Sequence, residues 1–154
     1  MSVQVSTGFK TLILGPNSFE SVFNQGRVLI YSGAQPANAD AAAQGTYIGQ
    51  ITLNGAVWAP FGSDGGLIFA RAGVWVSKPV ASAWQLVAAV TGVAGWFRLV
   101  GPAPDTGDLS NSAPRIDGTI GTGGAVELVL SSPSQTAGMS TAVQQFTYTI
   151  PPVL

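Results

Sequence analysis

The run Arg27-Val-Leu-Ile-Tyr31 is followed, after a loop of small residues, by the run Thr46-Tyr-Ile-Gly-Gln-Ile-Thr-Leu53. Both runs are rich in side chains that favour β-structure. In the second run Tyr47, Ile51 and Leu53 alternate with polar residues, so they are expected on one face of a strand. The pattern predicts a strand, an ordered loop and a second strand, and the rest of the chain repeats this β theme.

Further strand patterns follow at short intervals. Gly95-Trp-Phe-Arg-Leu-Val-Gly101 is apolar on both faces apart from its arginine, as expected of a central strand that is covered on both sides. Two short runs around Ala72-Gly73 predict a hairpin. Alternation marks strands near residues 115–120, 126–130 and 145–150. About eight or nine strands with turn-rich connections predict an all-β fold, an antiparallel β-sandwich that is jelly-roll-like.

One short N-terminal helix is predicted at about residues 17–25. Asn17 can cap its start, and Glu20, three residues later, can reach back to the cap. The apolar residues that follow share one face, which either closes one end of the core or docks a partner. The side chains expected in the core are Ile30, Ile51, Leu53, Trp96, Leu99, Leu128, Phe146 and Tyr148.

Composition limits the classes of function. A chain of 154 residues is expected to form one domain, residues 1–154, with extended N- and C-terminal segments. Charged residues make up 8%, against about 25% in ordinary soluble domains. A surface with so little charge is either simply polar and uncharged or covered by a partner, and we favour the partner.

The same composition argues against several partners and compartments. The net charge is −1 without a basic run, so no nucleic-acid partner is expected. No segment approaches the roughly 20 apolar residues of a membrane helix, and no membrane partner is expected. The start of the sequence does not resemble a secretory signal. The absence of cysteine fits assembly in a reducing cytoplasm.

Catalytic chemistry has few candidates. The chain contains no His and no Cys, which excludes the commonest general base and the soft metal ligands. Asp105 and Asp108 could contribute to a calcium site, or they are two solvated loop aspartates. Glu20 and Glu127 could form a glycosidase pair, but nothing in the sequence places them together. We therefore expect no enzyme, no catalytic residue, no cofactor and no metal.

Two groups of side chains are assigned structural roles. Arg98 lies within an apolar strand and Asp117 within another short strand, so the two could form a buried ion pair, or Arg98 points to solvent. The four tryptophans are interpreted as core residues rather than a platform for a ligand. They are Trp58, Trp75, Trp84 and Trp96.

The segments 28–40, 45–53, 95–98 and 114–118 together resemble, in the same order, a group of small tailed-bacteriophage proteins. The likeness extends over most of the chain after residue 5. Within that group, the chain is most similar to jelly-roll cement or decoration proteins that bind the outside of an HK97-type capsid. The matching segments contain no site motif, so no functional residue is transferred to this chain.

The resemblance implies a structural virion protein, assembled in the host cytoplasm, with the major capsid protein as partner and a homo-oligomer, a dimer or trimer, as its form. The contact face is expected to use the N-terminal segment, loop 101–113 and the proline-ended C-terminus. The alternatives are a tail or baseplate structural protein and, from another class, a carbohydrate-binding β-sandwich. Exposed indoles would favour the carbohydrate binder, and buried ones would argue against it.

Overall fold

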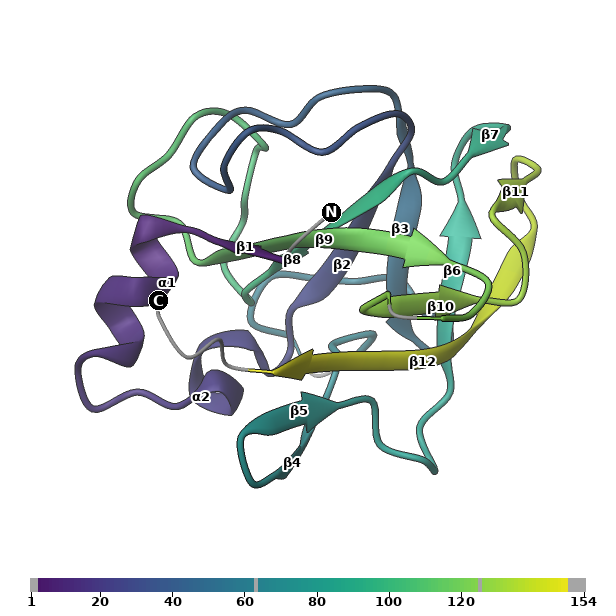
Figure 1. Ribbon diagram of the computed structural model, residues 1–154. Helices are drawn as coiled ribbons and strands as arrows, with labels where there is room; N and C mark the ends of the chain where they lie inside the picture. The colour runs from purple at the N-terminus through teal and green to yellow at the C-terminus, as the bar shows by residue number, and fades with distance from the viewer. Residues whose placement is uncertain (1–2, 63, 125, 150–154) are drawn as a thin grey trace.

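A computed structural model describes residues 3–62, 64–124 and 126–149 (Figure 1). Strands account for 37% of the chain and helices for 8%, which confirms the all-β prediction. The elements in chain order are β1 (Gln4–Val5), α1 (Thr7–Ile13), α2 (Phe19–Phe23), β2 (Arg27–Tyr31), β3 (Tyr47–Leu53), β4 (Ala70–Ala72), β5 (Trp75–Ser77), β6 (Trp84–Ala88), β7 (Gly92–Val93), β8 (Trp96–Val100), β9 (Arg115–Gly121), β10 (Leu128–Leu130), β11 (Ser134–Gln135) and β12 (Ser140–Thr149).

Seven of these strands close into a barrel, in the order β9-β8-β2-β3-β6-β12-β10. Neighbours in this order pair antiparallel, and the closure between β10 and β9 is parallel, with Leu128 opposite Ile120. A two-layer sandwich, as in a jelly roll, is not confirmed, because continuous pairing around the barrel replaces two separate facing sheets.

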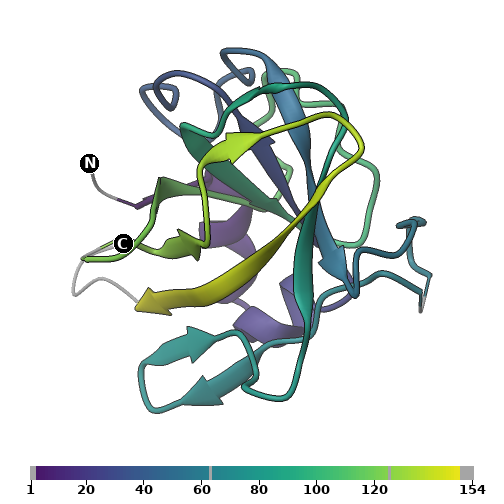
Figure 2. The ribbon, with the colours of Figure 1, turned by 90° about the vertical axis from the view of Figure 1, so that its right-hand side faces the viewer.

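The long strand β12 makes the closure possible because it pairs with three strands. Its first residues pair with β6, its middle with β10 and its last residues, Thr147 to Thr149, with β5. The hairpin β4–β5 therefore extends the sheet beyond the barrel and confirms the hairpin expected at Ala72-Gly73. In Figures 1 and 2 this hairpin lies at the bottom of the molecule.

A β-bulge corrects the expected facing of the second strand. Ile30 pairs with Gly49 and Tyr31 pairs with Tyr47, so Ile48 is an extra residue on β3. Ile48 and Ile51 both enter the main core, whereas Tyr47 lies on the outer face against Tyr31. Simple alternation had placed Tyr47 with Ile51, and the extra residue reverses its side.

Two helices, rather than one, precede the barrel. α2 lies within the predicted range, but its N-cap is Ser18. In a capping box, the backbone amide of Ser21 donates to Ser18 Oγ and the backbone amide of Ser18 donates to Ser21 Oγ. Asn17 instead donates to the Leu12 carbonyl at the end of α1. Glu20 does not serve as the capping partner. The two helices insert three phenylalanines into the main core, Phe9, Phe19 and Phe23.

Alternate residues of β8 face two different apolar clusters. Phe97 and Leu99 enter the main core inside the barrel, and Trp96 and Val100 pack on the outer face with Leu29, Tyr31 and Ala43. The whole of β8 is consequently buried, as predicted for a central strand. The expected core residues are buried, except that Leu53 is half-buried and Trp96 lies in the outer cluster.

Candidate functional site

Two long loops, residues 32–46 and 101–114, cover the outer face of β2, β8 and β9. They lie in the upper part of Figures 1 and 2, at the opposite end of the molecule from the hairpin β4–β5. The loops are joined by two backbone hydrogen bonds, from Ala43 to Gly107 (2.8 Å) and from Ser110 to Asp40 (2.9 Å). Polar side chains beneath and between these loops form two buried ion pairs and several hydrogen bonds to the loops.

Arg98 and Asp117 form a buried ion pair beneath the loops. The two residues lie opposite each other on β8 and β9. Arg98 Nε donates to Asp117 Oδ1 and Nη2 to Oδ2, both at 2.8 Å, and both side chains are fully buried. Nη2 also donates to the Ala41 carbonyl at 3.0 Å, which ties the first loop to the sheet. The predicted pair is confirmed, and the solvent-facing alternative for Arg98 is wrong.

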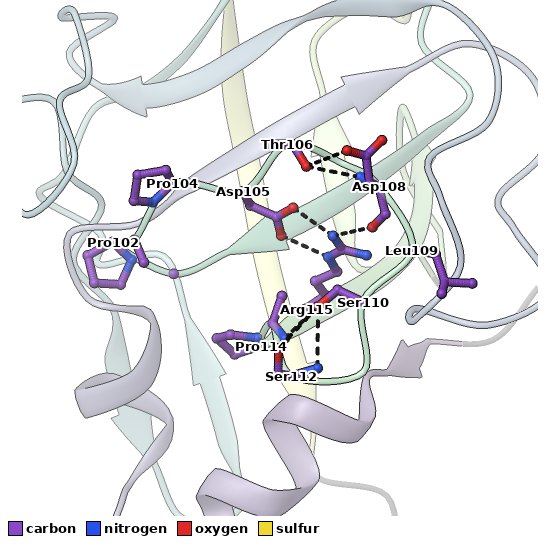
Figure 3. Close-up of a pocket in the computed structure, with 13 residues that line it drawn as sticks. Pro102, Pro104, Asp105, Thr106, Asp108, Leu109, Ser110, Ser112, Pro114 and Arg115 are labelled. Carbon is purple, nitrogen blue, oxygen red and sulfur yellow. Dashed lines mark hydrogen bonds and ion pairs between the residues drawn. The ribbon is translucent and has the colours of Figure 1, made fainter.

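A second buried pair, between Arg115 and Asp105, was not predicted. Arg115 Nε and Nη2 donate to the two carboxylate oxygens of Asp105 at 2.8 and 2.7 Å. Nη2 also donates to the Asp108 carbonyl at 2.7 Å. Figure 3 shows the guanidinium and the carboxylate facing each other across the loop. Arg115 therefore fixes loop 101–114, and weaker bonds from its Nη1 reach the carbonyls of residues 39–41 in the other loop.

The two carboxylates differ in their electrostatic environment. Burial acts to raise the pKa of Asp105, but hydrogen bonds from Arg115 and from the Gly107 amide outweigh it and hold the pKa below its usual value. Burial raises the pKa of Asp117, although Arg98 acts in the opposite direction. Each carboxylate is matched by one guanidinium, so the pairs leave little net charge beneath the loops.

A cavity of about 530 Å³ lies within loop 101–114 (Figure 3). Its wall combines three prolines with the Asp105–Arg115 pair and the serines 110 and 112. Both charged groups are already paired, and Leu109 is turned away from them. Asp108, the third charged group of the wall, keeps an exposed carboxylate that accepts only from Thr106 among the described residues, and the other polar groups hold the loop in shape.

A shallower groove of about 440 Å³ lies next to this cavity, between β2, β3 and residues 105–108. Tyr31 and Tyr47 meet edge to face in it, with ring centroids 5.8 Å apart. Arg27 forms part of its wall and stacks on Trp58, with 4.1 Å between the guanidinium carbon Cζ and the centroid of the indole ring. Burial raises the pKa of both tyrosines, so their hydroxyls stay protonated near neutral pH.

The carboxylates considered for chemistry have separate structural roles. Asp105 is paired with Arg115, so it is not a solvated aspartate, and the carboxylate of Asp108 accepts from Thr106 (2.9 Å). Within the described residues no three metal-ligating side chains gather, so the calcium alternative gains no support.

The proposed glycosidase pair is not brought together either. Glu20 pairs with Arg71 of the hairpin at 3.4 Å, while Glu127 accepts from the amide and hydroxyl of Thr119. Between residues 3 and 149, as far as they are described, no contact joins the two carboxylates. Each one instead connects neighbouring elements of the fold.

The tryptophans divide into two classes. Trp84 and Trp96 are buried, as expected of core residues. Trp75 is 52% exposed on the hairpin and Trp58 is half-buried beneath Arg27, so the core interpretation is wrong for these two. The mixed result does not remove the carbohydrate-binding alternative.

Comparisons with known proteins add no relative: no protein-family model, no curated protein and no solved structure matches the chain. None of the helices in the described residues is both long and apolar enough to cross a membrane.

Proposed function

We propose that the protein is a non-enzymatic structural component of a tailed-bacteriophage virion, which binds the major capsid protein on the outside of the head as a homo-oligomer. The observation that carries the proposal is the character of the surface. Of thirteen charged side chains, six basic and seven acidic, three are exposed: Asp64, Arg71 and Asp108. The others are half-buried or buried, many of them in pairs.

Large apolar side chains are exposed in two segments, which also carry two of the three exposed charges, Arg71 and Asp64. On the β4–β5 hairpin and its flanks, Ile68, Val74, Trp75 and Val80 are between 50% and 101% exposed. In loop 54–66, Val57 is 86% and Phe61 69% exposed. Segments in which exposed large apolar side chains outnumber exposed charges are typical of a protein that is covered by partners. This character favours a subunit of an assembly over a freely diffusing enzyme.

The hairpin is the segment best placed to reach a partner. It continues the sheet past the barrel, and β4 is an edge strand whose outer side is unpaired within the described chain. Loop 101–113, which the sequence suggested as a contact segment, is instead folded back onto the barrel by Arg115. The N-terminal segment, where it is described, pairs with the barrel through β1 and β9. Residues 1–2 and the proline-ended C-terminus, residues 150–154, lie outside the described residues.

Support for the cement role comes from this surface and from the resemblance of the sequence to phage proteins. The fold adds no support, because a jelly roll would be built from two facing sheets and the seven-stranded barrel is closed. Many copies on one shell would gain from multivalent attachment.

Particles made without the protein test the proposal. They should assemble, but they should break at a lower temperature or a lower osmotic stress than complete particles. Adding back the purified protein should restore resistance, whereas a Trp75→Glu variant should not, because a charge at the exposed hairpin opposes burial. Equal resistance of particles with and without the protein would contradict the cement role.

A further inference from the structure

The groove between β2, β3 and residues 105–108 has features that a structural role does not use. The residues that line it, in the part of the chain that the structure describes, lie outside the β4–β5 hairpin that the proposed attachment employs. Its volume of about 440 Å³ lies within the range of about 300–1,000 Å³ of small-molecule sites. Attachment through the hairpin would therefore leave the groove open to solvent.

A rigid aromatic wall forms one side of the groove. Tyr31 is stacked on the buried Trp96, with centroids 4.7 Å apart and planes 16° apart. Tyr47 packs edge to face on Tyr31 and keeps 38% of its surface exposed. Neither hydroxyl has a hydrogen-bond partner among the described residues. The wall consequently offers an apolar ring surface and two free hydroxyls that are already held in position.

Polar groups of both kinds face this wall. Arg27 is fixed by stacking on Trp58 and by donating from Nη1 to Gln50 at 2.8 Å; its Nε is buried without a partner, and its Nη2 donates to none of the described residues. The exposed carboxylate of Asp108 is oriented by Thr106. A donor and an acceptor thus flank the rings. Asp105 is not available to a ligand, because Arg115 occupies both of its oxygens.

The combination selects a neutral ligand that has both C–H faces and hydroxyl groups. An anion would meet Asp108 as well as Arg27, and a metal ion would find one free carboxylate, fewer ligands than calcium requires. A purely apolar ligand would leave the arginine and the carboxylate desolvated. A pyranose ring satisfies all the groups, because its C–H face can stack on Tyr47 while adjacent hydroxyls donate to Asp108 and accept from Arg27.

We propose that this groove binds a neutral pyranose sugar, with Tyr47 as the stacking residue and Asp108 as the hydrogen-bond acceptor. This inference does not rest on the virion role, since the groove and the hairpin are separate surfaces. The sugar can be a free monosaccharide or a residue of a polysaccharide, and the same contacts would recognise either.

Titration of the intact protein with the methyl glycosides of glucose, mannose, galactose and N-acetylglucosamine, followed by amide NMR shifts, tests the site. At least one sugar should shift the amides of residues 27–31, 47 and 105–108 with saturation. Tyr47→Ala should weaken that binding about tenfold, the range of one lost aromatic contact. Tyr47→Phe should retain most of the affinity, because it keeps the ring.

Matched variants distinguish the groove from other exposed rings. Trp75→Ala, which removes an exposed indole at the opposite end of the molecule, should leave the affinity unchanged. Asp108→Asn should weaken binding severalfold without altering the fold, because the carboxylate is exposed. A parallel titration with dextran distinguishes a free monosaccharide from a polysaccharide as the ligand. If a dextran chain binds more tightly than the monosaccharide, the ligand is a polysaccharide. Failure of the four glycosides and dextran alike to shift the groove amides, or sensitivity to Trp75→Ala instead of Tyr47→Ala, would overturn the proposal.

Discussion

Arg98 and Arg115 extend from neighbouring strands to the same outer face of the barrel, and each is matched by one aspartate. The Nη2 atoms of both arginines also donate to backbone carbonyls of the two covering loops, whereas Nη1 of Arg98 is buried without a partner among the described residues. Burying an arginine without a carboxylate partner would cost several kcal/mol of folding free energy. The loops can therefore cover the two arginines only because the ion pairs form. The second pair therefore explains why a 14-residue connection, residues 101–114, is ordered without secondary structure.

Asp105→Asn should destabilise the protein by about 3–5 kcal/mol, because it leaves the buried Arg115 guanidinium without a counter-charge. Urea denaturation at neutral pH measures the loss. Asp108→Asn, a change of the same chemistry in the same loop, is the control and should stay within about 0.5 kcal/mol of the native protein. Equal effects of the two substitutions would show that the pair does not hold the loop.

Asp105 should also determine part of the loss of stability at acid pH. The pKa of Asp105 is lower in the folded protein than in the unfolded chain, so its contribution is present above about pH 4 and is lost as the pH falls through the folded pKa. Below pH 4 the native protein should thus lose stability more steeply than Asp105→Asn. Asp117 is present in both proteins; its pKa is raised mainly by burial and in smaller part by the charge of Asp105, so only that smaller part differs between them. Parallel acid curves would contradict the assignment.

Tyr148 gives a prediction at the alkaline end. Its hydroxyl is buried in the main core without a hydrogen-bond partner among the described residues, and burial raises its pKa to about 12. The folded pKa exceeds the unfolded value of 10, so the neutral ring supports the fold below pH 10 and this support falls away as the pH rises towards 12.

Tyr148→Phe should remove that alkaline loss. At neutral pH the variant should be as stable as the native protein or up to about 1 kcal/mol more stable, because the deleted hydroxyl is unsatisfied. Between pH 10 and 12 its advantage should grow by about 2 kcal/mol, since one pKa unit corresponds to about 1.4 kcal/mol. Thermal or denaturant unfolding across this range measures the difference. A variant clearly less stable at neutral pH would reveal a hydrogen bond to the hydroxyl.

At the scale of elements, β10 is the strand that closes the barrel. Leu128 is fully buried between β9 and β12 and belongs to the main core. Leu128→Ala should cost about 2–5 kcal/mol in denaturant melts, the range for deletion of a buried leucine side chain. Leu109→Ala, the same substitution at a residue that is 79% exposed, should have little effect. A loss below about 0.5 kcal/mol at Leu128 would show that the closure is misplaced.

Local patterns predict elements better than they predict how the elements pair. The strands at Arg27–Tyr31 and Trp96–Val100 were readable from the sequence, because apolar and β-branched side chains cluster there. Closure depends on a parallel contact between β10 and β9, and alternation within one strand carries no information about its partner. The bulge at Ile48 was hidden for a related reason, since the extra residue is defined against β2.

The two ion pairs also differ in how clearly the local sequence indicates them. Arg98 stood out because it interrupts an apolar run, whereas Arg115 begins its strand and is not set apart by apolar neighbours on both sides. A signal was present: Arg115 directly follows a loop that contains two aspartates, one of them ten residues away. The groove beside Tyr31 and Tyr47 joins residues of four segments, 27–31, 42–43, 47 and 105–108, so only the folded chain brings it together.

On the scale of the whole molecule, two ends of the barrel have different characters. The loop end is rich in paired polar groups and carries the proposed sugar groove. The hairpin end exposes apolar side chains next to an unpaired edge strand. We expect the hairpin end to contact the phage head, and a contact with at least two neighbouring subunits should bury more than the roughly 1,600 Å² of a standard interface.

Electron microscopy of purified virions carrying the labelled protein tests the central claim most directly. The structural account predicts density on the outer surface of the head, repeated with the symmetry of the shell, with the β4–β5 hairpin against the capsid subunits and the loop end turned outward. Density confined to the tail or baseplate would contradict the head assignment and support the tail alternative. Virions that contain none of the labelled protein would contradict the structural role altogether.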